Sequence, residues 1–250
     1  MPSYVLEVMY DGTQFHGSQV QGLTPTVQLA VNTTLSTLLR IPIETVGASR
    51  TDEGVHALCN FYQFSYDAPL RPDFIYKCNA ILPGGIAAKA VYLALKPDFN
   101  PRFDAIRRRY RYRIYNKKNP FLLHKALFYP FPLDLGMLRQ TADIIAGYTQ
   151  FESFAKRNSQ THTFNCTIFQ SYWEEHDGEL HYIVEANRFL RGMVRGLVCT
   201  QLNMSRKGTP QELITILDAR DCTKAFFNVA GHGLYLEAIT YPDGMLEQLF

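Results

Sequence analysis

A short polar segment, GASRTDEGVHA (residues 47–57), gathers side chains that could do chemistry between two apolar runs. Gly54 suits the turn that such a segment needs, and loops held by a rigid scaffold often carry reactive groups. Asp52 is the candidate carboxylate, although a loop aspartate can also bind neighbouring backbone N–H groups and do nothing more. Glu53 follows it directly, but consecutive residues in extended backbone point to opposite sides, so we do not expect a catalytic pair.

The segment RRRYRYRIY (residues 107–115) has a composition that could bind RNA. In a strand, alternate residues share a face, which separates Arg107, Arg109, Arg111 and Arg113 from Arg108, Tyr110, Tyr112 and Ile114. Guanidinium groups bind phosphates and aromatic rings stack on unpaired bases, so the two faces together suit RNA. The alternative is a solvated edge strand whose arginines discourage aggregation.

A third segment, NRFLRGMVRGLV (residues 187–198), spaces three arginines by three and four residues. This spacing predicts that Arg188, Arg191 and Arg195 share one face of a helix over residues 190–202. Arg195 lies among apolar residues, and a buried charge is costly unless a carboxylate compensates it. That carboxylate could belong to a structural ion pair or to a functional site.

Neither a metal site nor a cofactor site is expected. His56, His162 and His232 have no ligand partner three or four residues away, and the chain has no glycine-rich phosphate loop. The five cysteines are widely spaced without a CxxC pair, which predicts free thiols in a reducing compartment.

The composition is that of a globular protein: 250 residues, 46% of them hydrophobic and 19% charged. No segment approaches the roughly 20 apolar residues of a membrane span, and the N-terminus lacks a basic leader, so we expect a cytoplasmic protein. Residues 1–104 hold 7 Lys and Arg against 9 Asp and Glu, whereas residues 105–250 hold 18 against 14. The positive charge is therefore concentrated in the second half.

The periodicity of apolar residues predicts two similar halves. In the first half we expect strands at 4–10, 43–47, 57–65 and 86–95, a helix at 72–80, and a helix beginning at Thr24 and Pro25. In the second half we expect strands at 107–115, 166–174, 180–186 and 234–241, and helices at 135–146, 190–202 and 210–217. Thr209 to Glu212 has the pattern of a capping box, which strengthens the start of the last helix.

Two successive βαββαβ patterns predict an α+β protein with two ferredoxin-like halves, residues 1–104 and 105–250. Each half should have an antiparallel sheet with its helices on one face. The first half carries the Asp52 loop, and the second carries the tyrosine strand and the arginine helix. An RNA-binding cleft between the halves is the expected site.

Taken in order, these segments resemble the TruA family of tRNA pseudouridine synthases along nearly the whole chain. The resemblance rests on YDGTQFHGSQ (10–19) with TVQ (26–28), SRTDEGVHA (49–57), RRYRYRIYN (108–116), NRFLRGMVR (187–195) and GLYLEAITYP (233–242). It implies that Asp52 is the nucleophile and that Arg50 enters the base stack to hold an extruded uridine. It further implies that Tyr110 stacks on the flipped base and that Arg195 pairs with Asp52.

The implied reaction breaks the C–N glycosidic bond of a uridine, rotates the uracil and joins its C5 to the same sugar carbon. Uracil can leave as a delocalised anion, so one carboxylate can replace the two of a typical glycosidase. Attack at the sugar carbon, addition to C6 and proton abstraction all remain open. The resemblance also implies a substrate at uridines 38 to 40 of the tRNA anticodon stem-loop, a homodimer and no cofactor. The expected RNA contacts are Arg107, Arg109, Arg111, Arg113 and Arg191.

Four positions near the motifs differ from the usual family pattern: Ser18, Ser49, Glu53 and Cys166. Serine replaces a tryptophan at position 18, and cysteine replaces an arginine that would contact phosphate at position 166. Three alternatives stay open: a divergent paralogue with another RNA target, a catalytically silent RNA-binding protein, and a carboxylate enzyme acting on a small glycoside or nucleoside.

Overall fold

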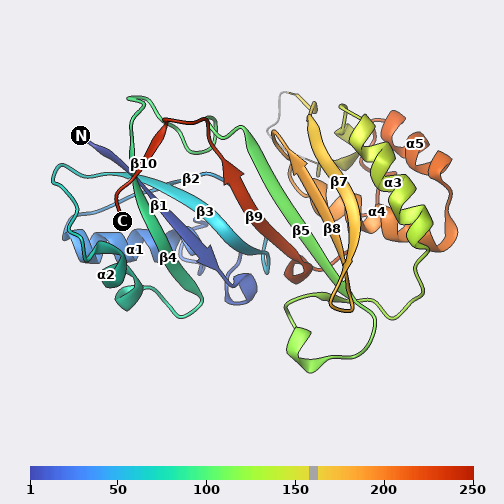
Figure 1. Ribbon diagram of the computed structural model, residues 1–250, viewed down its shortest axis with the longest axis horizontal. Helices are drawn as coiled ribbons and strands as arrows, with labels where there is room; N and C mark the ends of the chain where they lie inside the picture. The colour runs from blue at the N-terminus through green and yellow to red at the C-terminus, as the bar shows by residue number, and fades with distance from the viewer. Residues whose placement is uncertain (158–162) are drawn as a thin grey trace. The chain divides into compact units, whose positions relative to one another are not determined.

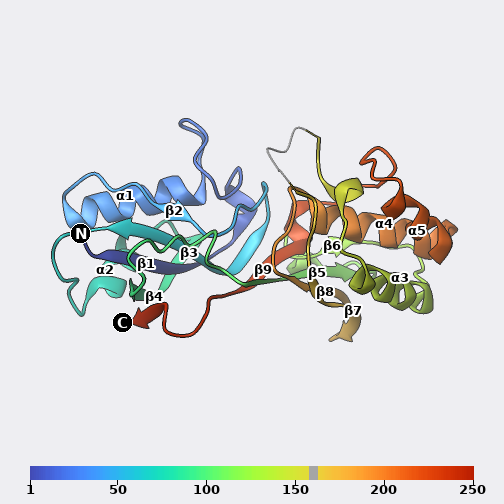
Figure 2. The same ribbon diagram turned by 90° about the horizontal axis from the view of Figure 1, so that it is seen from above.

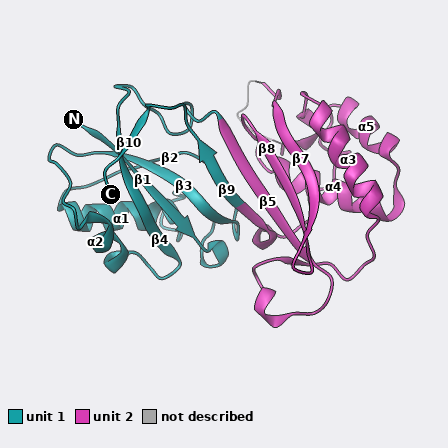
Figure 3. Ribbon diagram, in the orientation of Figure 1, with its two compact units in different colours: residues 1–106, 236–250 teal, residues 107–235 magenta. Residues whose placement is uncertain are grey.

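The computed structural model describes residues 1–157 and 163–250 and divides the chain into two compact units (Figure 3). Unit 1 comprises residues 1–106 and 236–250, and unit 2 comprises residues 107–235. Residues 236–250 thus group with residues 1–106, and the division into ferredoxin-like halves 1–104 and 105–250 stays a prediction. The expectation of an α+β protein with mostly antiparallel strands is confirmed. The expected cleft stays a prediction.

Unit 1 is built on β1, whose residues pair antiparallel with β3 on one side and β4 on the other. Its strands are β1 (Ser3–Tyr10), β2 (Val46–Gly47), β3 (His56–Ser65), β4 (Ile86–Ala94), β10 (Leu246–Gln248) and most of β9 (Leu234–Thr240). The order is β10-β4-β1-β3-β9, and β2 pairs with β3. Figure 2 shows the C-terminal end of the chain beside β4, where β10 pairs.

Two helices complete unit 1. α2 (Phe74–Ile81) packs against β4 and against α1 (Val27–Leu39). The predicted start of α1 at Thr24 and Pro25 is wrong, because the cap is Thr26, whose side chain accepts a hydrogen bond from the Leu29 N–H. The Pro25 carbonyl accepts a hydrogen bond from the His16 N–H at 3.0 Å, which keeps Pro25 in the preceding loop.

Unit 2 has an antiparallel sheet in the order β5-β8-β7, with β6 parallel to β5. Its elements are β5 (Arg107–Tyr115), β6 (Leu127–Phe128), α3 (Leu135–Gly147), β7 (Ile168–His176), β8 (Glu179–Ala186), α4 (Met193–Lys207) and α5 (Pro210–Asp218). Figure 1 shows α3, α4 and α5 gathered together, and α3 packs on β7. The capping box of Thr209 and Glu212 is present, as predicted.

Short 3-10 turns link several of these elements: η1 (Gly12–Gln14), η2 (Pro120–Leu122), η3 (Glu152–Phe154) and η4 (Gly231–Gly233). β2 covers only the end of the strand expected at 43–47. Within the described residues, every helix is too short or too polar to cross a membrane.

Candidate active site

Asp52 lies on a tight turn between β2 and β3 in unit 1. The Val55 N–H donates to the Asp52 carbonyl at 3.2 Å, and Gly54 has a φ of +75°, as the sequence predicts for this turn. The Asp52 side chain is half-buried, whereas Glu53 is exposed and lies 3.4 Å from the His16 ring. The turn thus gives the two neighbouring carboxylates different environments.

Buried hydrogen bonds hold the residue before Asp52 in place. The Thr51 N–H donates to the Ser18 hydroxyl at 2.8 Å, and the Ser18 N–H donates to the Thr51 carbonyl at 3.0 Å. The Thr51 hydroxyl is also 2.9 Å from the Tyr10 hydroxyl. Burial raises the pKa of Tyr10 to about 12 despite its hydrogen bonds, so Tyr10 stays protonated at neutral pH.

Asn60 fixes the same segment from β3. Its amide donates to the Ser49 carbonyl at 3.0 Å, and its carbonyl accepts from the Ser49 N–H at 3.3 Å. The Ser18 hydroxyl lies 3.4 Å from the same Ser49 carbonyl. Ser18 and Ser49, two of the departures from the family pattern, therefore take part in holding the Asp52 turn.

Two glycines allow the first loop of the chain to approach this turn closely. A Cβ on Gly17, which has a φ of +91°, would lie 2.8 Å from the Thr51 carbonyl oxygen. A Cβ on Gly12 would lie 2.0 Å from the Val55 carbonyl oxygen. The backbone at Gly17 and Gly12 therefore lies against the backbone at Thr51 and Val55, on both sides of Asp52. A larger residue at either glycine would displace the Asp52 turn.

Arg50 has the environment expected of a residue that contacts a substrate. Its side chain is exposed, and within the described residues it forms no hydrogen bond or ion pair. An exposed guanidinium without a protein partner keeps its donors available for phosphate or for a base.

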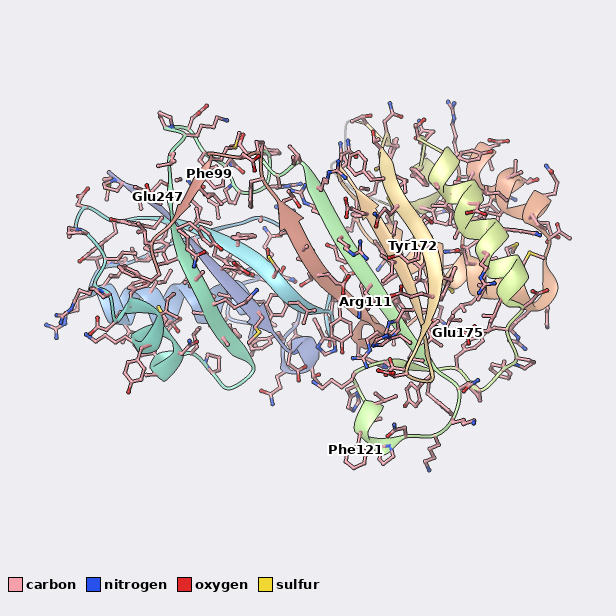
Figure 4. All side chains as sticks on the ribbon, in the orientation of Figure 1. Phe99, Arg111, Phe121, Tyr172, Glu175 and Glu247 are labelled. Carbon is pink, nitrogen blue, oxygen red and sulfur yellow. The ribbon has the colours of Figure 1, made fainter. Side chains whose placement is uncertain are left out.

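Strand β5 of unit 2 places the four predicted arginines on one face. Arg109 donates to the Gln170 side chain at 2.7 Å and to the Tyr172 hydroxyl at 2.9 Å, both on β7. Arg111 and Tyr172 are each paired with Ile183 of β8, so they share this face (Figure 4). Ile183 is fully buried although it lies on the arginine face, as expected when long side chains extend over it.

Carboxylates of β8 neutralise part of this face. Arg107 lies 3.0 Å from Glu185, and Arg113 makes two hydrogen bonds to Glu179 at 2.8 and 2.7 Å. The sequence did not indicate these partners, because they lie more than 60 residues away along the chain. Arg107 and Arg113 therefore have structural contacts of their own, whatever they contribute to RNA binding.

The opposite face of β5 is packed inside unit 2. Tyr112 is fully buried and donates to the Ala230 carbonyl at 2.8 Å, which is a structural role. Tyr110 is 7% exposed, and its ring meets the edge of Phe189 at a centroid distance of 5.2 Å. Of the aromatic rings expected to stack on bases, Tyr112 is thus part of the core, and Tyr110 has only a narrow exposed surface.

The three arginines predicted on one helical face do not share a helix. α4 begins at Met193 because Gly192 has a φ of +75°, a left-handed conformation that does not continue into a helix. Arg188 and Arg191 therefore lie in the preceding loop, and only Arg195 is helical. The Arg195 guanidinium donates to the Val229 carbonyl at 3.0 and 2.6 Å, which orients it.

The remaining sequence predictions concern cysteines and histidines. All five cysteines are free. Burial raises the pKa of the Cys166 thiol to about 11, so the thiol is neutral at neutral pH and does not supply the positive charge of the usual family arginine. His56 accepts a hydrogen bond from the Gly12 N–H at 3.1 Å, and His232 packs edge-on against His124. His162 lies outside the described residues. Asp52 belongs to unit 1 and Arg195 to unit 2, and their pairing stays a prediction.

Comparison with known proteins agrees with the motifs. A family model described as tRNA pseudouridine synthase matches residues 142–242. The chain is 34% identical to tRNA pseudouridine synthase A of Parabacteroides distasonis, with 97% of each chain covered, and 34% identical to that of Bacteroides fragilis, with 98% of each covered. It is 35% identical to tRNA pseudouridine synthase A of Fervidobacterium nodosum, over 96% of this chain and 100% of the relative. With such likeness over nearly full length, the chain belongs to the tRNA pseudouridine synthase A family and is an isomerase that acts in tRNA modification.

Proposed function

We propose that this enzyme converts uridine to pseudouridine at positions 38 to 40 of the tRNA anticodon stem-loop, with Asp52 as the nucleophile. The observation that carries the proposal is the Asp52 turn, where buried bonds to Ser18, Tyr10 and Asn60 hold a half-buried carboxylate close in sequence to the exposed Arg50. Preorganised groups of this kind lower the entropic part of a reaction barrier.

The reaction conserves all atoms of the substrate. The bond from N1 of uracil to the ribose C1′ breaks, the bond from C5 to C1′ forms, and the hydrogen displaced from C5 is balanced by the proton gained at N1. No electrons enter or leave, so the isomerisation itself needs no redox cofactor. The carboxylate of Asp52 is free again at the end.

The other residues are assigned to substrate binding. A uridine inside a helix must be extruded, which costs a few kcal/mol that stacking and phosphate contacts offset. We assign Arg50, Tyr110 and Arg195 to the extruded uridine. The arginine face of β5 and Arg191 are assigned to the RNA backbone, and the exposure of Arg191 supports this assignment.

The proposal extends to architecture and assembly. The order βαββαβ in unit 1, with β4-β1-β3-β2 neighbours, supports a ferredoxin-like fold for that unit. The family resemblance supports a cytoplasmic homodimer bound to one tRNA. Light scattering of the purified protein, with and without tRNA, tests the dimer.

The decisive experiment compares the wild type with Asp52→Asn and Glu53→Gln on unmodified tRNA transcripts. Pseudouridine is mapped by carbodiimide labelling and reverse transcription. We expect signal at positions 38 to 40 for the wild type and for Glu53→Gln, a matched change in the same turn, and none for Asp52→Asn. Pseudouridine made by Asp52→Asn would refute the role of Asp52.

Other outcomes separate the remaining alternatives. Signal only at other uridines would identify a paralogue with another target, and Asp52 would keep its role. Tight tRNA binding by the wild type without any pseudouridine would show a silent RNA-binding protein.

A further inference from the structure

An open pocket in unit 1 adjoins the segment that carries Asp52. Ser49 and Arg50 contribute to its wall from that segment, and Arg102 and Phe103 contribute from the loop after β4. The cavity volume is about 220 Å³, and the pocket is open to solvent. This volume is below the roughly 300 to 1,000 Å³ of typical small-ligand sites, so the pocket suits one part of an extended ligand whose remainder lies outside it.

The lining of the pocket is basic although residues 1–104 carry more acidic than basic groups. Among the described residues, no aspartate or glutamate lines it, whereas Arg50 and Arg102 do. Two acids adjoin lining residues in the sequence, Glu44 before Thr45 and Asp104 after Phe103. Asp104 accepts hydrogen bonds from the Asn100 N–H at 2.8 Å and from Lys96 at 2.7 Å. These bonds hold the pKa of Asp104 below its usual value. The pocket therefore favours an anionic ligand.

The pocket also presents an aromatic ring to solvent. Phe103 is 76% exposed, and the Arg102 guanidinium lies 5.4 Å from the centre of its ring. The Asn100 side chain accepts hydrogen bonds from the N–H groups of Arg102 and Phe103 at 3.0 and 3.3 Å, so an ordered turn carries the ring. An arginine beside an exposed aromatic ring suits a nucleic-acid base with its phosphate.

Polar groups able to contact a base edge are present as well. Gln19 lines the pocket, and its side-chain amide makes no hydrogen bond with the described residues. Gln28 differs, because its amide accepts from the Val20 N–H at 3.1 Å and donates to the Thr45 carbonyl. Gln19 therefore retains both a donor and an acceptor for a ligand.

We propose that this pocket binds an unpaired nucleotide of the RNA substrate, with its base stacked on Phe103 and its phosphate held by Arg102. The inference rests on the proposed function. Asp52 does not line the pocket but Arg50 does, so we assign the pocket to a nucleotide that neighbours the reacting uridine. The pocket thus contributes to the choice of RNA site and not to the chemical step.

The test is a coupling experiment on RNA binding. Wild type, Phe103→Ala and the control Phe121→Ala are titrated with tRNA transcripts that carry one abasic nucleotide near the anticodon loop, at each position in turn. Phe121 is 89% exposed and lies in unit 2, so its change removes an equally accessible ring elsewhere.

We expect Phe103→Ala to weaken binding of intact tRNA about tenfold, the loss typical of one base stack, and Phe121→Ala to leave it unchanged. At one position, removal of the base should weaken binding to the wild type about tenfold. The same removal should leave binding to Phe103→Ala unchanged, because the stacking partner is already missing. Unchanged binding by Phe103→Ala, or additive losses at every position, would overturn the inference. The test measures binding and not pseudouridine formation, so the two proposals are refuted by different results. Absence of coupling refutes the pocket even if pseudouridine forms, and absence of pseudouridine refutes the proposed function even if coupling is observed.

Discussion

The Ser18 hydroxyl accepts a hydrogen bond from the Thr51 N–H at 2.8 Å, so a residue of the first loop fixes the backbone next to Asp52. Ser18 is 2% exposed, and its removal would leave a buried N–H without a partner. Such a loss costs about 1 to 3 kcal/mol. The bond therefore links the stability of unit 1 to the position of the proposed nucleophile.

Ser18→Ala should lower kcat about tenfold because the Asp52 turn is less well held. Ser36→Ala is the control, since the Ser36 hydroxyl accepts from the Ile43 N–H at the same 2.8 Å in the same unit. Both variants should lose similar unfolding free energy in urea, but only Ser18→Ala should lose turnover. Equal kcat values for the two variants would show that the bond is structural alone.

Gly17→Ala should damage the site more than Gly22→Ala does, although both glycines have positive φ. Alanine at either position pays about 1 to 2 kcal/mol of backbone strain. At Gly17 its Cβ would also push the Thr51 carbonyl, whereas nothing lies within 4 Å of a Cβ on Gly22. We expect a further loss of stability and an about tenfold lower kcat for Gly17→Ala, measured by urea unfolding and by single-turnover kinetics. Indistinguishable variants would contradict the close packing.

Arg111→Gln should reduce the salt dependence of tRNA binding. Each phosphate contact contributes about 0.7 to 0.9 to the slope of log affinity against log salt concentration. Arg139→Gln removes the same charge from the exposed surface of α3, outside the arginine face. The slope should fall by nearly one for Arg111→Gln and stay the same for Arg139→Gln. A slope that is equal in both variants would exclude a phosphate contact by Arg111.

The Arg113 and Glu179 pair predicts a pH dependence of stability. Burial alone would raise the pKa of Glu179, but hydrogen bonds from Arg113 and His181 outweigh it and lower the pKa below the ordinary 4.5. A lowered folded-state pKa gives stability that is complete above about pH 4.5 and is lost as pH falls through the folded value. The stability advantage of the wild type over Glu179→Gln should therefore shrink below pH 4.5.

Urea unfolding at pH 7, 5, 4 and 3 measures this effect. Glu175→Gln on β7 is the control, because that carboxylate is exposed and makes no ion pair within the described residues. Its difference from the wild type should stay nearly constant with pH. A constant difference for Glu179→Gln would show that the pair does not stabilise unit 2.

The sequence predicted those features that depend on neighbouring residues. The bounds of β5, the arginines on one face of it and the capping box of α5 all follow from local alternation or local hydrogen bonds. Local patterns failed where a distant contact or an unusual backbone decided the outcome. His16 holds Pro25 outside α1, and the conformation of Gly192 delays the start of α4.

The site was predicted only in part for the same reason. Asp52 and its turn are visible in the sequence because glycine and polar residues cluster there. The bonds from Tyr10 and Asn60 join residues 41 and 11 positions apart, and no spacing rule reveals them. The carboxylates that pair with Arg107 and Arg113 lie 78 and 66 positions away, so no spacing rule reveals them either.

Unit 1 is made of two separate stretches of the chain, because residues 107–235 form unit 2 before the chain returns to unit 1 at residue 236. Unit 2 is one continuous stretch, and residues 236–250 are synthesised after all of its residues. Those later residues supply β10, which hydrogen-bonds to β4. The edge of β4 therefore has no β10 partner until residues 246–248 have left the ribosome, and an unpaired strand edge can pair with other chains. A chaperone that binds exposed strand edges would therefore find its target on the older part of the nascent chain.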